Sequence, residues 1–208
     1  MSVEIWAAFA LASAILLVIP GPTILLVVSY ALGQGWRTAL PMALGVAAGD
    51  FTAMTLSMLG LGALLAASGH VYLALKWIGA AYLVWLGIKL WRAGGTLQAA
   101  PRRDAASASR MFAHAWAVTA VNPKSLTFFI AFLPQFLDPA RPFAAQMIVF
   151  ETTFLLLAFA NALAYAALAS RARGVFRNER ALRIVNRVGG SLLIGAGVAT
   201  ATFRTTHA

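Results

Sequence analysis

Residues 5–32 read IWAAFALASAILLVIPGPTILLVVSYAL, an apolar stretch without a charged residue that is interrupted at Pro20-Gly21-Pro22. A helix needs about 20 mostly apolar residues to cross a bilayer, so this stretch is long enough to span one. Proline removes a backbone donor and clashes with the preceding turn, which breaks a helix. We therefore predict a membrane-spanning helix made of two halves.

The composition extends this prediction to all 208 residues, of which 61% are hydrophobic and 11% charged. Soluble domains have roughly 45–50% apolar and about 25% charged residues. The formal net charge of +10 does not indicate nucleic-acid binding, because the basic residues fall in short blocks between apolar stretches. The chain contains no cysteine, which excludes disulfides, thiolate metal sites and cysteine nucleophiles.

Five further apolar stretches follow the first, and we predict an all-α membrane protein with six transmembrane helices. They cover about 39–67, 71–91, 112–137, 142–170 and 188–203. The fourth stretch is interrupted at Asn122-Pro123-Lys124. The N-terminal stretch lacks the basic start and cleavage site of a signal peptide, so we interpret it as a retained first span.

Basic residues predict the orientation, because Lys and Arg concentrate in cytoplasmic loops. We expect these loops to contact anionic lipid, with both termini outside the plasma (inner) membrane. One side holds Arg37, Lys89, Arg92, Arg102, Arg103, Arg110, Arg171, Arg173, Arg177, Arg180, Arg183 and Arg187; the other holds Lys76, Arg141 and Arg204.

The single transmembrane domain, residues 1–208, divides into two similar halves. Repeat one covers about 1–93, a cytoplasmic loop about 94–111, and repeat two about 112–208. Because three is an odd number of spans, the second copy must insert upside down, with helices 1 and 4 both broken near the midplane. Inverted repeats of this kind recur in secondary transporters, whose paired breaks point to the substrate site.

Two further correspondences support the repeat. Asp50 in the second stretch matches Glu151 in the fifth, and a glycine pair in the third stretch has the same spacing as a pair in the sixth. The glycines are Gly79, Gly87, Gly189 and Gly197. Chance coincidence of short glycine patterns is the alternative. These small-residue faces could pack within one chain or build a homodimer.

The breaks supply the first candidate residues for substrate binding or coupling. A new half-helix beginning at Pro22 or Pro123 exposes N–H groups and a positive dipole end, which bind carboxylates. Asn122 is placed to cap the second half-helix. Two kinks that pack against neighbouring helices are the alternative. The candidates are Pro20, Gly21, Pro22, Thr23, Asn122, Pro123 and Lys124.

Ionisable residues inside apolar stretches supply the others: Asp50, Lys124 and Glu151. Asp and Lys at such positions cost about 2.5–3.5 kcal/mol each, and they usually take part in transport or proton relay. A structural ion pair of Lys124 with Asp50 or Glu151 is a compatible alternative. Asn161 is a weaker candidate, since an interhelical hydrogen bond explains it more simply. No metal-ligand spacing or nucleotide-binding motif is present, so we expect no cofactor and an ion gradient as the energy source.

Several of these segments resemble the LysE/RhtB family of amino-acid exporters along essentially the whole chain. They are Pro20–Thr23, Gly45–Asp50, Ile78–Gly87, Asn122–Phe129 and Phe132–Phe136. The resemblance implies a six-helix inner-membrane carrier that expels amino acids or their derivatives in exchange for protons. It favours neutral substrates such as threonine, homoserine or leucine.

Our hypothesis is therefore an exporter with alternating access and no enzymatic activity. The half-helix N-termini and Lys124 would hold the substrate carboxylate, while Asp50 and Glu151 would bind its ammonium group or the coupled proton. A passive channel, or a membrane-embedded enzyme using Asp50 and Glu151 as acid and base, is the alternative.

Overall fold

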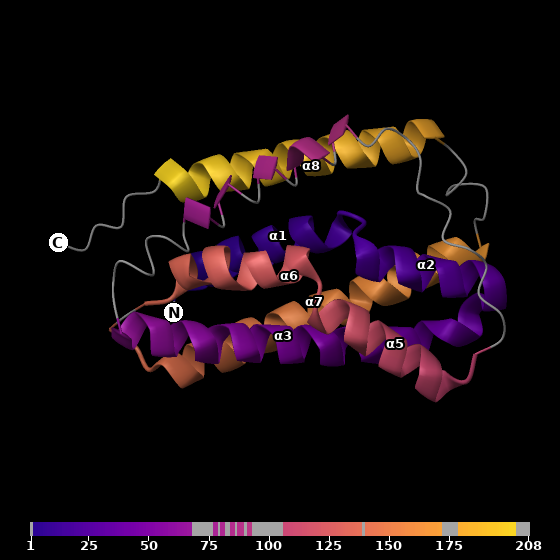
Figure 1. The fold of residues 1–208 in the computed structure, drawn as a ribbon, viewed down its shortest axis with the longest axis horizontal. Coiled ribbons are helices and arrows are strands. Elements are labelled where there is room, and N and C mark those ends of the chain that lie inside the picture. Colours follow the sequence, from indigo (N-terminus) through magenta and orange to yellow (C-terminus); the bar gives the residue numbers. More distant parts are fainter. Residues whose placement is uncertain are drawn as a thin grey trace.

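In the residues it describes, the computed structural model of this chain has helices as its only regular structure (Figure 1). It describes residues 2–67, 106–138, 140–171 and 179–202, and the helical positions 77–78, 80–81, 84–85, 87–89 and 91–92. The elements are α1 (Val3–Val18), α2 (Pro22–Gln34), η1 (Gly35–Thr38), α3 (Ala39–Ala67), α5 (Ala108–Ala120), α6 (Pro123–Thr127), η2 (Phe128–Phe132), η3 (Leu133–Phe136), α7 (Phe143–Arg171) and α8 (Glu179–Thr202).

The first apolar stretch forms two helices, as predicted. The Ser2 side chain caps α1 by accepting from the Ile5 N–H at 3.3 Å. Ile19 is extended, with φ −72° and ψ 116°, because the following proline disfavours the helical conformation at this position. Pro22 then occupies the first turn of α2, where the missing N–H costs nothing. The prediction of a helix broken at Pro20–Pro22 is confirmed.

The fourth stretch is also broken, and α5 and the segment Pro123–Phe136 meet at an angle of 42°. After α6 the helix widens into the π-helical turn η2 and then tightens into the 3₁₀ turn η3. Pro134 lies at the start of η3, and its ring excludes a regular helical bond to the turn before it. The sequence predicted the break but not the irregular turns.

The helices lie roughly along one long axis, and the chain reverses at the two ends of the molecule (Figure 1). The turn between α2 and α3, the start of α5 and the end of α7 lie at one end. The start of α1, the end of α3 and the start of α7 lie at the opposite end. At the first turn Gly35 has φ +73°, a left-handed conformation that glycine adopts without strain.

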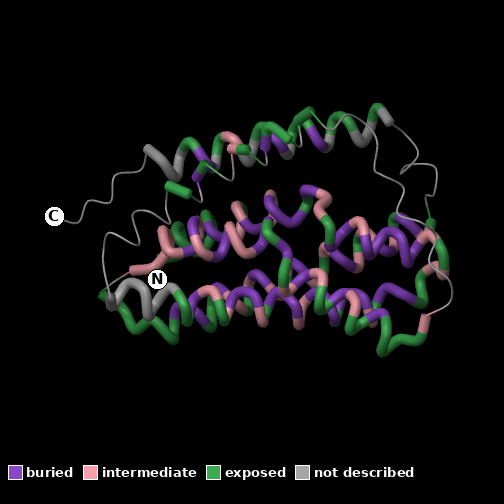
Figure 2. Tube along the Cα trace, in the orientation of Figure 1, coloured by how far each residue is buried: buried purple, intermediate pink, exposed green. Residues whose placement is uncertain are grey.

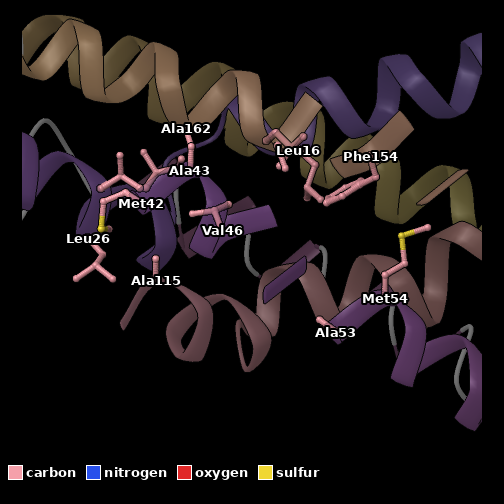
Figure 3. Packing of buried hydrophobic residues seen from close by; sticks show 14 of the residues in the cluster. Leu16, Leu26, Met42, Ala43, Val46, Ala53, Met54, Ala115, Phe154 and Ala162 are labelled. Atoms are coloured by element: carbon pink, nitrogen blue, oxygen red, sulfur yellow. The ribbon is translucent and has the colours of Figure 1, made fainter. Parts of the chain in front are cut away.

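The buried core lies between α1, α2, α3, α5 and α7 (Figure 2). Leu16 and Phe154 lie together in it, and so do Met42 and Leu26 (Figure 3). Many large apolar side chains face outward instead, among them Leu11, Leu40, Leu44, Leu56, Leu59, Ile148 and Leu156. Large exposed apolar areas are rare on soluble monomers, and outward-facing apolar side chains in this number are typical of lipid contact.

Glycines bring two pairs of helices into close contact. A Cβ on Gly45 would lie 2.5 Å from the Phe112 carbonyl oxygen, and one on Gly49 would lie 2.6 Å from Thr119 Cβ, so α3 packs directly on α5. The third apolar stretch packs on α8 in the same way. A Cβ on Gly87 would lie 2.6 Å from the Gly190 carbonyl oxygen, and a Cβ on Gly190 would lie 2.6 Å from that of Gly87. Gly197 makes a third such contact, so Gly87 and Gly197 of the predicted small-residue faces pack within one chain.

Part of the predicted set of six membrane spans lies within the described residues. Within the described ranges, Pro22–Gly60 and Phe143–Arg171 are long and apolar enough to cross a membrane, and the bent pair beginning at Ala108 would add a third crossing. The break leaves α1 with 16 residues, and much of the third stretch, including Gly79, lies outside the described residues. Six spans in two inverted repeats stay a prediction.

One predicted boundary is wrong. Helix α8 begins at Glu179, before the predicted start at 188, so Arg180, Arg183 and Arg187 lie on a helix and not in a loop. Arginine is a good helix former, and a charged turn can continue an apolar helix beyond the hydrocarbon layer. Arg171 is likewise the last residue of α7. Arg173 and Arg177 lie outside the described residues.

Candidate substrate site at the two helix breaks

The break after α1 leaves the last backbone carbonyls of that helix short of donors, and of these the Leu16 oxygen accepts from the Ile19 N–H at 3.3 Å. Three side chains from other helices donate to them. Lys124 Nζ donates to the Leu16 and Ile19 oxygens at 2.9 and 2.7 Å. Asn161 Nδ2 donates to the Leu17 oxygen at 3.0 Å, and the Tyr165 hydroxyl donates to the Val18 oxygen at 2.6 Å. The carboxyl end of α1 is thus a row of four acceptors, each with a side-chain donor.

Hydrogen bonds connect the break before α6 to the break between α1 and α2. Asn122 Oδ1 accepts from the Lys124 N–H at 3.1 Å, which caps α6 as predicted. Its Nδ2 donates to Thr23 Oγ1 at 3.0 Å, and Thr23 Oγ1 lies 3.2 Å from Thr119 Oγ1. Asn122 therefore joins the start of α2 to the start of α6. The N-cap of α2 is Gly21, which supplies no side-chain acceptor, so this helix end has no such cap.

Asp50 is 2% exposed and Lys124 is 7% exposed, and the two side chains are close enough to interact electrostatically. Ser125, also buried, lies within hydrogen-bonding range of the Asp50 carboxylate. In the described part of the chain Asp50 and Lys124 do not form a direct ion pair, since Lys124 Nζ binds the α1 carbonyls. Within that part, Asp50 Oδ1 has no hydrogen-bond partner. A buried carboxylate oxygen without a partner is costly and calls for a functional explanation.

Glu151 lies elsewhere on α7 and binds a different group. Its Oε1 accepts from Thr55 Oγ1 of α3 at 2.6 Å, and the side chain is partly exposed. Asp50 and Thr55 lie more than one turn apart on α3, so the two carboxylates occupy different levels of the bundle. The structure brings Asp50, Lys124, Asn122 and Thr23 together and leaves Glu151 outside this group.

Phenylalanine rings fill the half of the bundle between this site and the end that holds Ser2. Phe9 and Phe150 have ring centroids 4.5 Å apart, and Phe129 and Phe154 are 4.9 Å apart. The remaining rings of the cluster are Phe128, Phe132 and Phe136. In the other half the buried face of α7 consists of Ala158, Ala162, Ala166 and Ala169. Along α7, the buried face therefore changes from large aromatic side chains to alanines.

Sequence reasoning missed several members of the site. Ser125 follows directly after the Asn-Pro-Lys motif, and Tyr165 lies four positions after Asn161, on the same face of α7. Helical spacing could have identified Tyr165. The carbonyl acceptors at the end of α1 could not be recognised from the sequence, because every residue has a backbone carbonyl. No group of three or more His, Asp or Glu side chains lies together in the described ranges, and His114 is placed against the Tyr30 hydroxyl at 3.2 Å.

A helical protein with an apolar exterior, and with polar and charged side chains gathered at two broken helices, has the construction of a membrane transporter. The chain belongs to the LysE type translocator family, whose model matches residues 14–203. Its family consists of translocators, so the chain is a transport protein and not an enzyme.

Curated relatives cover nearly the whole chain. It is 34% identical to the homoserine/homoserine lactone efflux protein of Salmonella typhimurium over 203 residues, which covers 97% of this chain and 98% of that protein. It is 33% identical to an uncharacterized membrane protein of Vibrio cholerae over 202 residues, with the same coverage. It is 30% identical to the leucine efflux protein of an Enterobacter species over 146 residues, 69% of each chain. No solved structure matches the chain significantly.

Proposed function

We propose that this protein is a secondary transporter of the bacterial inner membrane that exports neutral amino acids or their derivatives by proton antiport. The observation that carries the proposal is the buried carboxyl group of Asp50, which lies near Lys124 at two broken helices and has one oxygen without a hydrogen-bond partner among the described residues. Relatives named as homoserine, homoserine lactone and leucine efflux proteins support this substrate class.

The substrate carboxylate is best accommodated at the start of α2. That end has no side-chain cap, whereas Asn122 already caps α6. Free N–H groups and the positive end of the helix dipole favour an anion there. The assignment narrows the original hypothesis, in which both half-helix N-termini were equal candidates.

Matched contacts across the bundle support an inverted repeat and alternating access. Trp6 of α1 donates to Thr153 of α7 at 3.0 Å, and Trp116 of α5 donates to Thr52 of α3 at 3.2 Å. Each threonine hydroxyl also donates to the carbonyl four residues before it, those of Val149 and Ala48. If α1 corresponds to α5 and α3 corresponds to α7, the Trp6–Thr153 and Trp116–Thr52 hydrogen bonds occupy equivalent positions in the two repeats. Motion of one repeat against the other would open the phenylalanine-filled half.

The test is amino-acid efflux from liposomes that contain the purified full chain. Liposomes loaded with labelled homoserine, leucine or threonine should release at least one of them faster when a pH gradient is imposed, and a protonophore should abolish the increase. External unlabelled substrate should drive counterflow, which requires alternating access. Liposomes without protein are the control. Release that neither saturates nor shows counterflow would indicate a passive channel and overturn the proposal.

A further inference from the structure

The carboxyl end of α1 is an acceptor site in the middle of an apolar protein. Its four carbonyls, from Leu16 to Ile19, carry the negative end of the α1 dipole. In a bilayer core no water is available to satisfy such groups, so a donor must come from the protein or from a ligand. A cation with several N–H groups is the ligand that fits this end best.

A cation already lies there, and it belongs to the protein. The Lys124 ammonium donates to two of the four carbonyls, and its side chain reaches them across Gly21. A Cβ on Gly21 would lie 3.4 Å from Lys124 Cε and 3.6 Å from Nζ. A primary ammonium has three donors, and these two bonds use two of them. The α-ammonium group of an amino acid has the same charge and the same three donors.

Lys124 also has a second place to bind. Asp50 Oδ1 is buried without a hydrogen-bond partner in the described part of the chain, and the two side chains already attract each other. If Lys124 left the α1 carbonyls, it could pair with this carboxylate and supply the missing partner. Asn161 and Tyr165 hold the two other carbonyls independently, so the α1 end would keep its shape.

We infer that the carboxyl end of α1 is the subsite for the primary ammonium group of the substrate, and that Lys124 occupies it when substrate is absent. A substrate ammonium displaces Lys124 to Asp50, and release of the substrate lets Lys124 return. No covalent step is involved. The inference rests on the proposed function, because it requires a cargo with an amine.

Two interpretations of Lys124 make opposite predictions. As an internal competitor it weakens the binding of every primary amine, whether or not the ligand has a carboxylate. As a carboxylate partner, the role first assigned to it, it strengthens the binding of amino acids and not of their esters. Leucine, leucine methyl ester and 4-methylpentanoate, which lacks the amine, separate these cases.

The first experiment measures the binding of these three ligands to the full chain in nanodiscs. In Lys124→Met we expect leucine and its methyl ester both to bind about tenfold more tightly than in the wild type, because no internal ammonium has to leave its charge-assisted hydrogen bonds. We expect no binding of 4-methylpentanoate. Lys124→Arg, which keeps a cation, is the matched control and should not tighten either ligand. Weaker binding of leucine with an unchanged ester, or no change for either, would overturn the inference.

A second experiment needs only the wild-type protein, so it holds even if Lys124→Met does not fold. Two carbonyls now accept from Nζ, so a ligand needs two N–H groups to replace Lys124. Leucine and N-methylleucine should bind with similar affinity, while N,N-dimethylleucine and the trimethyl derivative should bind about tenfold more weakly or worse. Equal affinity across the series would overturn the inference. If efflux of homoserine, leucine and threonine is absent the proposed function fails, whereas efflux with a flat series removes the ammonium subsite alone.

Discussion

Asp50 is a buried acid whose surroundings satisfy it only in part. Lys124 offsets its charge from a distance, and one carboxylate oxygen has no hydrogen-bond partner among the described residues. A neutral amide at this position would lose the attraction to Lys124 and keep the same shape. Glu151 accepts a hydrogen bond from the Thr55 hydroxyl and is partly exposed, so its carboxylate is better satisfied than that of Asp50.

This difference predicts unequal effects of neutralising the two acids. Asp50→Asn should reduce efflux at least about tenfold, since ionisable groups inside a bundle usually take part in the transport cycle. Glu151→Gln should have a smaller effect, because the amide oxygen can still accept from Thr55. Initial efflux rates from liposomes, normalised to the amount of folded protein, check both. Normal efflux by Asp50→Asn would refute the role assigned to this carboxylate.

Much of the site's membership could be predicted from single residues. Asp50, Lys124 and Asn122 are conspicuous because polar groups are costly within apolar stretches, and the structure places them together. The bonds of Lys124 could not be predicted, because every residue has a carbonyl and only the path of the chain shows which ones are free. The sequence paired Glu151 with Asp50 by position in the repeat, but corresponding positions in two copies need not touch each other.

At the scale of elements, the helix ends follow from local chemistry. Pro20 and Pro123 set the positions of the two breaks. The side chains of Ser2 and Asn122 cap the helices that follow them. The start of α8 was misplaced because hydropathy detects the apolar part of a helix and not its charged turns. The π-helical turn η2 also had no signal, since Phe128–Phe132 is uniformly apolar.

The contact between α3 and α5 depends on the absence of side chains at two positions of α3. We expect Gly49→Val to lower the melting temperature of the purified protein strongly, because Thr119 Cβ and the Trp116 carbonyl oxygen would lie 2.6 and 2.7 Å from the new Cβ. Overpacking of this kind typically costs about 1–3 kcal/mol. The separation of α5 should also weaken the Trp116–Thr52 hydrogen bond.

Gly60→Val is the matched control, since Gly60 lies on the same helix and a Cβ there would meet nothing within 4 Å. Both changes introduce the same β-branched residue, so their intrinsic effect on helix stability is similar. Equal melting temperatures for the two variants would show that the close approach of α3 and α5 contributes little.

At the scale of the whole molecule, the chain reversals gather at two ends (Figure 1). The predicted orientation assigns the end that holds the start of α5 to the cytoplasm, because Arg37, Arg110 and Arg171 lie there. The opposite end, with Ser2 and Ala140, would then face outward. The assignment depends on the distribution of charge and not on the fold, which would look the same either way up.

The lack of cysteine makes this orientation directly measurable. A membrane-impermeant maleimide added to intact cells should label Ala140→Cys and leave Ser109→Cys unlabelled, since both side chains are exposed but at opposite ends. Permeabilised cells should label both, which controls for reactivity. The reverse pattern in intact cells would mean that the basic loops face outward.

The two breaks differ in one residue that sets a stoichiometry. Lys124 follows Pro123 directly, while Thr23 follows Pro22, so the breaks together hold one basic side chain and not two. Lys124 is thus a single internal cation for the proposed exchange, and the carboxyl end of α1 is the row of carbonyls that receives it. Each chain should therefore carry a single molecule of cargo per cycle, and a binding titration should saturate at one equivalent.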